Sequence, residues 1–375
     1  MSETVQTNQH GHKAWIDALK GIAICGVLLI HAGGNGLPGF AGQVANIGFQ
    51  SIPLLIVISA YLTFVSLERY YEKGQGTGKT PSYVHWWLKK FVSLIPIYYL
   101  AIFFYMLILR EGDLYWLASK GRISFTNMLA HLLLLHGLNP YYCDSVLGIE
   151  WYLGDLALFY LLAPFLYKKI TNLEKAVCFF LITTLGANCI NYAAYSLMPQ
   201  TDVYVYESYI GYFWIFTQLP VFAAGILLYF FLRRMNDMES CRNRRVLSYC
   251  ILLFCVCMLM GETFEKNQIM GVSKYALASV WFLGVIISQI IHSCHVIVNP
   301  FFAELGKNSY AIYLFHYLLL KLYNKYVPIH IQNAYLDWFV RFSVIMLLSY
   351  VLSLFLERFF NKPVGRFLAK YILQR

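Results

Sequence analysis

Charged residues are scarce in this chain, and that scarcity excludes most soluble folds. Asp, Glu, Lys and Arg make up only 13% of the 375 residues, whereas 59% are hydrophobic and 18% are aromatic. These fractions lie far outside the range of ordinary soluble domains. Because a spanning helix needs about 20 apolar residues, the chain can hold about ten helices and has no room for a sizeable soluble domain. We therefore expect an all-α, polytopic membrane bundle with one domain over residues 1–375.

Three further signatures are lacking. The start, MSETVQTNQHGHKAW, has no basic region followed by an apolar core, so we expect no cleavable signal peptide and a first helix that remains as a span. The nine cysteines lie mostly inside apolar segments, where cysteine behaves as a small hydrophobic residue, and no disulfide framework is indicated. His292, Cys294 and His295 form a short cluster without further ligands at a recognisable spacing, so we expect no metal site.

The basic residues behind the net charge of +10 fall in short loops between apolar runs. The positive-inside rule explains this placement better than nucleic-acid binding does, so the expected partner is the lipid bilayer and not nucleic acid. The apolar segments lie approximately at residues 14–34, 45–67, 87–109, 125–138, 150–167, 176–197, 208–232, 246–261, 275–297, 308–327 and 337–356.

The segment at 125–138 is too short to span comfortably, and we interpret it as a re-entrant or membrane-buried helix. With about ten spans plus this short helix, the basic loops collect on one side of the membrane. If the short segment were counted as a full span, the basic clusters at Lys168 and Arg233 would lie on the outer side of the membrane, against the positive-inside rule. The tails at 1–13 and 357–375 are therefore predicted to be cytoplasmic.

The first apolar segment carries ionisable residues at membrane depth. Lys20 and His31 are spaced so that, at about 100° and 1.5 Å per residue, they share one helix face roughly 16 Å apart along the axis. Asp17 lies on the same face. An ionisable residue inside a membrane is a functional-site hypothesis by default, because it costs several kcal/mol. Two alternatives stay open: Lys20 could snorkel to the interface, and His31 could be a neutral histidine that a neighbouring helix satisfies.

The segment at 308–327 carries a second polar face. Ser309, Tyr313 and His316 are spaced so that they share one side of a helix, with His316 near mid-membrane. His316 is therefore a second candidate for chemistry. A hydrogen-bonded packing role is the alternative, because Phe315 and Tyr317 flank it.

Motifs follow one another along nearly the whole chain: IDALKGIAICGVLLIH, GFQSIPLLIVISAYL, LKKFVSLIPIYY, SVLGIEWYLGDLALFYLLAPFL, QLPVFAAGILLYF, LGKNSYAIYLFH and LERFFNKP. In this order they resemble the membrane acyltransferase-3 family, the integral-membrane O-acyltransferases of bacterial surface glycans and related acceptors. His31 stands on the family's histidine and Lys20 on its arginine. Ser59 and Tyr61 stand in the family's Ser-Gly-Tyr motif, with alanine in place of the glycine.

The chain departs from the family's pattern at several positions. Lysine replaces the arginine at Lys20, and Lys90 and Ser93 occupy the paired basic positions before the third helix. Many members carry a glutamate where this chain has Leu156, with Asp155 beside it. A lysine keeps the positive charge but loses the planar fork that holds a phosphate in two places, so donor binding is expected to be reorganised.

The resemblance implies transfer of an acyl group, acetyl in the first instance, from cytoplasmic acyl-CoA to a hydroxyl of a cell-surface or lipid-linked glycan. Such a transfer needs a base for the hydroxyl and stabilisation of an oxyanion. His31 is the candidate base because imidazole has an unperturbed pKa near 6.5, and His316 is the second catalytic candidate. Lys20, Lys89 and Lys90 are candidate counter-charges for the donor's phosphates. The supporting candidates are Asp17, Ser59, Tyr61, Trp151, Asp155, Ser309 and Tyr313.

No permanently bound cofactor is expected, and acyl-CoA, most simply acetyl-CoA, is expected as a donor substrate. The implied location is the bacterial cytoplasmic membrane, and the formation of a homo-oligomer is left open. A different class of function also stays open: an exporter or flippase of a glycan or lipid, in which the intramembrane histidines relay protons.

Overall fold

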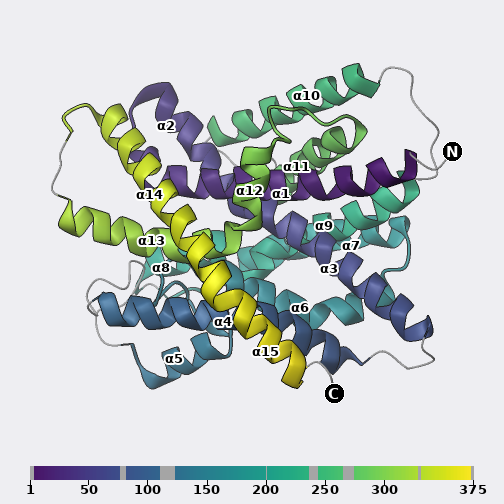
Figure 1. Ribbon diagram of the computed structural model, residues 1–375, viewed down its shortest axis with the longest axis horizontal. Coiled ribbons are helices and arrows are strands. Elements are labelled where there is room, and N and C mark those ends of the chain that lie inside the picture. Colours follow the sequence, from purple (N-terminus) through teal and green to yellow (C-terminus); the bar gives the residue numbers. More distant parts are fainter. Residues whose placement is uncertain are drawn as a thin grey trace. The chain divides into compact units, whose positions relative to one another are not determined.

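The computed structural model describes residues 4–76, 82–109, 123–199, 201–235, 244–264, 274–327 and 331–372 (Figure 1). Every regular element within these ranges is helical, which confirms the expected all-α class. Seven helical stretches in the described part are long and apolar enough to cross a membrane. The chain is therefore a multi-pass helical membrane protein.

The helices form two compact units, each built from two separate stretches of the chain. Unit 1 consists of Met1–Ile58 and Leu232–Leu354, and unit 2 consists of Ser59–Phe231 and Phe355–Arg375. The chain passes between the units inside three helices: α3 (Ser51–Gly76), α9 (Ile215–Met235) and α14 (Ala334–Leu356). The expectation of one membrane domain over residues 1–375 stays a prediction, and the two units are described separately below.

The other elements of unit 1 are α1 (Thr4–His31), η1 (Gly34–Gly36), α2 (Gly39–Asn46), η2 (Ile47–Gln50), α10 (Arg244–Phe264), α11 (Lys274–Ile291), α12 (Pro300–Lys307) and α13 (Ser309–Tyr326). The other elements of unit 2 are α4 (Tyr83–Ile108), α5 (Phe125–Leu132), η4 (His136–Leu138), α6 (Trp151–Lys169), α7 (Leu173–Leu197), α8 (Val203–Ser208), η5 (Tyr209–Phe213), η7 (Glu357–Asn361) and α15 (Lys362–Ile372).

The short segment predicted at 125–138 contains the 8-residue α5 and the turn η4 and no spanning helix. The spans expected at 150–167, 246–261 and 308–327 correspond to α6, α10 and α13, which are not among the seven spanning candidates in the described residues. The total of about ten spans therefore stays a prediction.

In unit 1, α12 packs closely against α1 (Figure 1). The helix α12 starts at a cap in which the Asn299 side chain accepts a hydrogen bond of 3.0 Å from the Phe302 N–H. A side chain at Gly21 would collide with the Phe302 carbonyl, and a side chain at Gly306 would collide with the Asp17 carbonyl. The two glycines therefore allow the backbones of α1 and α12 to touch, as small residues do between membrane helices.

In unit 2, α6 and α9 run side by side in the same direction. Trp151, the first residue of α6, packs on Phe213 just before α9, with ring centroids 5.5 Å apart. Two turns further along each helix, the rings of Phe159 and Phe222 stack at 4.4 Å. This pairing fixes the start of α6 and, with it, the preceding loop at 139–150.

Candidate functional site

The two catalytic candidates meet in unit 1. His31 is the last residue of α1, and its Nδ1 lies 2.9 Å from Nε2 of His316 in α13, with the two rings stacked at 5.0 Å between centroids. His316 is fully buried and His31 is half-buried. The sequence indicated both residues separately, and the fold places them in one hydrogen-bonded pair.

The partners of His316 determine which nitrogen of His31 can act as a base. The Nδ1 of His316 lies 2.7 Å from the carbonyl oxygen of Tyr313, and a carbonyl can only accept, so this nitrogen carries a hydrogen. In neutral His316, Nε2 must then accept a hydrogen bond from Nδ1 of His31. The basic lone pair of His31 is therefore on Nε2.

The end of α1 is held in place around His31. Gly33 has φ of +101°, a left-handed conformation that favours glycine and that commonly ends helices. The indole Nε1 of Trp338 donates a 3.1 Å hydrogen bond to the carbonyl of Leu29. The ring of Tyr317 meets the His31 ring edge-on at 5.4 Å. These contacts orient the histidine from α1, α13 and α14.

The lysines expected to bind the donor lie in different units. Lys20 is half-buried in α1 of unit 1, one helix turn from Asp17. In unit 2, Lys89 is exposed near the start of α4, and the Nζ of Lys90 lies 5.4 Å from the ring centroids of both Trp86 and Tyr160. Lys90 is thus engaged in cation–π contacts, and a shared role for the three lysines stays a prediction.

The supporting candidates are also divided. In unit 2, Ser59 shares a 2.7 Å hydrogen bond with the hydroxyl of Tyr152, the residue after Trp151. Tyr61 is buried in the same unit. In unit 1, Tyr313 reaches the histidine pair through its backbone carbonyl, and Ser309 is a half-buried residue at the start of α13.

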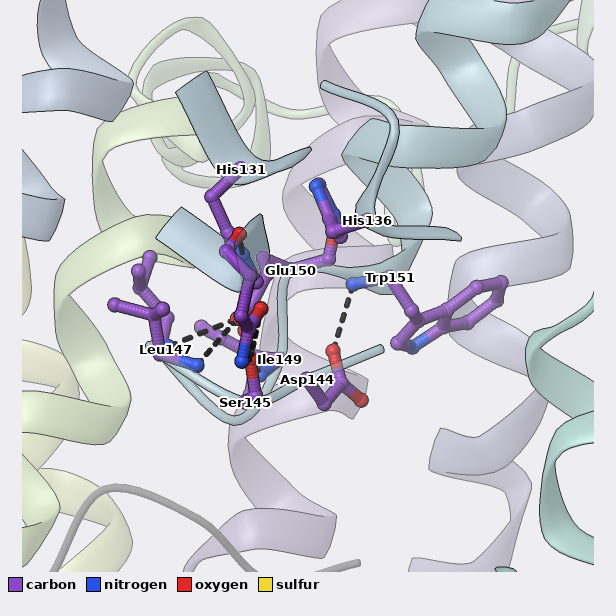
Figure 2. A network of polar contacts seen from close by, with 10 residues as sticks. His131, His136, Asp144, Ser145, Leu147, Ile149, Glu150 and Trp151 are labelled. Carbon is purple, nitrogen blue, oxygen red and sulfur yellow. Dashed lines mark hydrogen bonds and ion pairs between the residues drawn. The ribbon is translucent and has the colours of Figure 1, made fainter. Parts of the chain in front are cut away.

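A second polar cluster, which the sequence did not reveal, surrounds Glu150 in unit 2 (Figure 2). Its Oε1 accepts hydrogen bonds from the backbone N–H groups of Val146 at 2.8 Å and Leu147 at 3.0 Å, and its Oε2 accepts one from Ile149 at 2.9 Å. The Nε2 of His131 lies 3.0 Å from Oε1, and neither side chain is exposed. The loop is therefore wrapped around one buried carboxylate.

The contacts of His131 indicate its charge. Its Nδ1 faces the carbonyl of Asn127 at 3.0 Å, while Nε2 faces the Glu150 carboxylate, so both ring nitrogens face acceptors. This arrangement fits an imidazolium paired with a carboxylate. His136 stacks on His131 at 4.4 Å and donates from Nε2 to the carbonyl of Glu150. Its Nδ1 has no hydrogen-bond partner among the described residues, so a hydrogen there would be unsatisfied, and the contacts fit the neutral ring.

Two further acids border this cluster. Asp144 accepts a 2.7 Å hydrogen bond from the Trp151 N–H, and burial together with the nearby Glu150 charge raises the pKa of the Asp144 carboxyl well above its ordinary value. Asp155, one of the supporting candidates, is fully buried, and neither of its carboxylate oxygens has a hydrogen-bond partner among the described residues. Such an unsatisfied buried group is uncommon in a folded protein.

A local signal for this cluster does exist in the sequence. His131 and His136 stand close together in a segment too short to span, and Asp144, Glu150 and Asp155 flank the start of an otherwise apolar helix. The donors that bind Glu150 are backbone groups of a loop, however, and no side-chain pattern marks them.

A family model described as an acyltransferase domain matches residues 13–358, which is nearly the entire chain. No curated protein and no solved structure matches the chain.

Proposed function

Since the chain belongs to the membrane acyltransferase-3 family, we propose that it moves an acyl group, acetyl in the first instance, from cytoplasmic acyl-CoA to a hydroxyl of a cell-surface or lipid-linked glycan. The observation that carries this proposal is the His31–His316 pair, in which a hydrogen-bonded partner leaves one imidazole nitrogen of His31 basic. The site would lie in a bacterial cytoplasmic membrane, with the donor's nucleotide at the cytoplasmic surface.

In the proposed reaction, His31 acts first as a base and then as an acid. Its Nε2 takes the proton of the acceptor hydroxyl as the oxygen attacks the thioester carbonyl. The carbon–sulfur bond then breaks, and the thiolate of CoA leaves with the proton from His31. His316 is a positioning residue. Its Nε2 accepts the hydrogen bond from Nδ1 of His31, and its own Nδ1 donates to the Tyr313 carbonyl, so the two hydrogen bonds strengthen each other.

The proposal is tested by adding isotope-labelled acetyl-CoA to membranes that contain the protein. We expect label in the glycan fraction, and mass spectrometry of glycans from cells with and without the protein should show a shift of one acyl mass. Glycan movement across vesicles without covalent change would contradict the transferase and favour the exporter or flippase.

The predicted topology can be tested separately. We expect the loop from Met198 to Glu207 to face outward and the loop from Arg233 to Arg245 to face inward, because the second loop is rich in arginine. Residues 236–243 of that loop lie outside the described residues. Single cysteines, placed in each loop of a cysteine-free chain, are labelled with an impermeant reagent on intact cells. Labelling of the arginine-rich loop from outside would overturn the orientation and place both tails outside.

Lys20 is proposed to supply counter-charge to the donor's phosphates. Lys20→Met keeps much of the stem but removes the charge, so we expect the apparent KM for acyl-CoA to rise by about tenfold or more, given about 1.5 to 3 kcal/mol for a charged hydrogen bond. Lys20→Arg should retain most activity, because the guanidinium keeps the charge and adds donors. The measurement is a titration of acyl-CoA in purified membranes. An unchanged KM in Lys20→Met would mean that Lys20 only snorkels to the interface.

A further inference from the structure

The C-terminal helix α15 has a basic face that the acyl-transfer reaction does not use. Lys362, Arg366 and Lys370 are spaced four residues apart, which places them in one stripe that covers about 80° of the helix. All three are exposed. Phe367 lies beside this stripe, about 60° from Lys370 around the helix axis. Its side chain is exposed, with a relative accessible surface of 60%. The helix therefore presents cations and an exposed aromatic ring next to each other.

The length of the last apolar stretch places α15 at a membrane surface. The candidate span Ala334–Leu368 has 35 residues, or about 52 Å of helix, whereas the hydrocarbon core is about 30 Å thick. Arg341 and Glu357 are the charged residues that bound its uncharged part. Because α15 begins after Glu357, it lies beyond the part of the helix that fits in hydrocarbon.

The neighbouring helix in unit 2 has the same combination of side chains. The helix α15 contacts α4, and the first turns of α4 expose Val84 at 59% and Leu88 at 42%, next to the exposed Lys89. Apolar side chains next to cations are typical of helices that lie in the interface between headgroups and acyl chains. A nucleic acid or an acidic protein surface would match the cations but would leave these apolar side chains in water.

We propose that α15 is an interfacial helix that binds anionic phospholipid headgroups through Lys362, Arg366 and Lys370, with Phe367 inserted at the acyl boundary. Each basic residue near an anionic membrane surface favours binding by about fivefold, so the three together favour it by roughly a hundredfold. This site is distinct from the histidine pair and does not depend on the acyl-transfer activity.

The test uses the full-length protein in nanodiscs of pure phosphatidylcholine and in nanodiscs that contain phosphatidylglycerol. Hydrogen–deuterium exchange is followed in peptides from residues 355–372, and native mass spectrometry counts the retained phosphatidylglycerol. We expect exchange in α15 to slow by roughly a hundredfold in the anionic nanodiscs and this protection to weaken as salt is added. The triple variant Lys362→Gln, Arg366→Gln, Lys370→Gln should lose the protection and retain less phosphatidylglycerol.

A matched control removes three exposed cations elsewhere in unit 2. The variant Lys168→Gln, Lys169→Gln, Lys175→Gln should leave the exchange of α15 unchanged in both lipids, and thermal unfolding verifies that both variants fold. Equal protection of α15 in neutral and anionic lipid, or protection that survives in the α15 variant, would overturn the proposal and assign the order of α15 to packing on α4.

Discussion

Replacing His31 with alanine is expected to abolish acyl transfer while leaving the protein folded in the membrane. The change removes the imidazole that we propose takes the hydroxyl proton, and general-base catalysis of this kind contributes about 10²- to 10⁴-fold. His31 is only half-buried at the end of α1, so its loss removes no large apolar contact. Glycan acylation is measured with labelled acetyl-CoA, alongside the amount of protein in the membrane.

Two variants at His316 distinguish the proposed positioning role, in which His316 accepts the hydrogen bond from His31, from a role in packing alone. His316→Gln can still accept a hydrogen bond from Nδ1 of His31, whereas His316→Leu fills similar space but cannot accept it. We therefore expect the glutamine variant to retain more activity than the leucine variant, with a similar KM for acyl-CoA. Near-wild-type acylation by His31→Ala, or equal activity of the two His316 variants, would contradict the roles assigned to the pair.

Replacing Glu150 with alanine is expected to destabilise the protein by about 3 to 5 kcal/mol, the effect of breaking a buried, hydrogen-bonded ion pair. The backbone N–H groups of Val146, Leu147 and Ile149 would lose their common acceptor, and buried His131 would lose its counter-ion. Thermal unfolding in a fixed detergent gives the stability. Because the truncated side chain leaves the donors of a carboxylate site in place, added acetate should restore some of the lost stability.

Glu304→Gln is the control for that loss. Glu304 pairs with Lys307 at 3.2 Å, with the two side chains 43% and 58% exposed, and such surface pairs contribute about 1 kcal/mol at most. Glutamine keeps an oxygen that can accept the 3.2 Å hydrogen bond from the Asn308 amide. The two substitutions should therefore differ clearly in unfolding temperature. Similar losses in both variants, or no response of Glu150→Ala to acetate, would show that the buried carboxylate does not hold the loop together.

The long apolar runs make the helical architecture predictable, because the spacing of apolar residues and the length of each run can be read from neighbouring residues in the sequence. The polar face of α1 likewise identifies His31 without any structure. The contact between His31 and His316 joins residues 285 positions apart, so it depends on how α1 and α13 pack, which no local pattern encodes. The sequence predicts that residues 357–375 form a cytoplasmic tail, and this location stays a prediction. The structure adds that the described stretch, 357–372, is helical, which the four-residue spacing of its cations is too short a signal to indicate.

The backbone contacts of the Glu150 cluster cannot be predicted from the sequence. Its main donors are main-chain N–H groups, which every residue except proline possesses, and they converge in a loop that turns at Asp144, where φ is +55°, and at Gly148, where φ is +81°. Asp155 was named from the resemblance as a neighbour of a missing glutamate. Its complete burial without a hydrogen-bond partner among the described residues depends on how α6 packs, which no local pattern encodes.

The glycine contact between α1 and α12 helps to determine how His31 and His316 are placed relative to each other. Gly21 stands ten residues before His31, and Gly306 stands ten residues before His316. The only residue between α12 and α13 is Asn308, so the place where α12 touches α1 also determines where α13 begins. Because about 15 Å of helix separates Gly21 from His31, a tilt of α1 at the contact would move the His31 ring, whose Nδ1 lies 2.9 Å from Nε2 of His316. We therefore expect a side chain at Gly21 or Gly306, which would push the two backbones apart, to change the alignment of the His31–His316 pair.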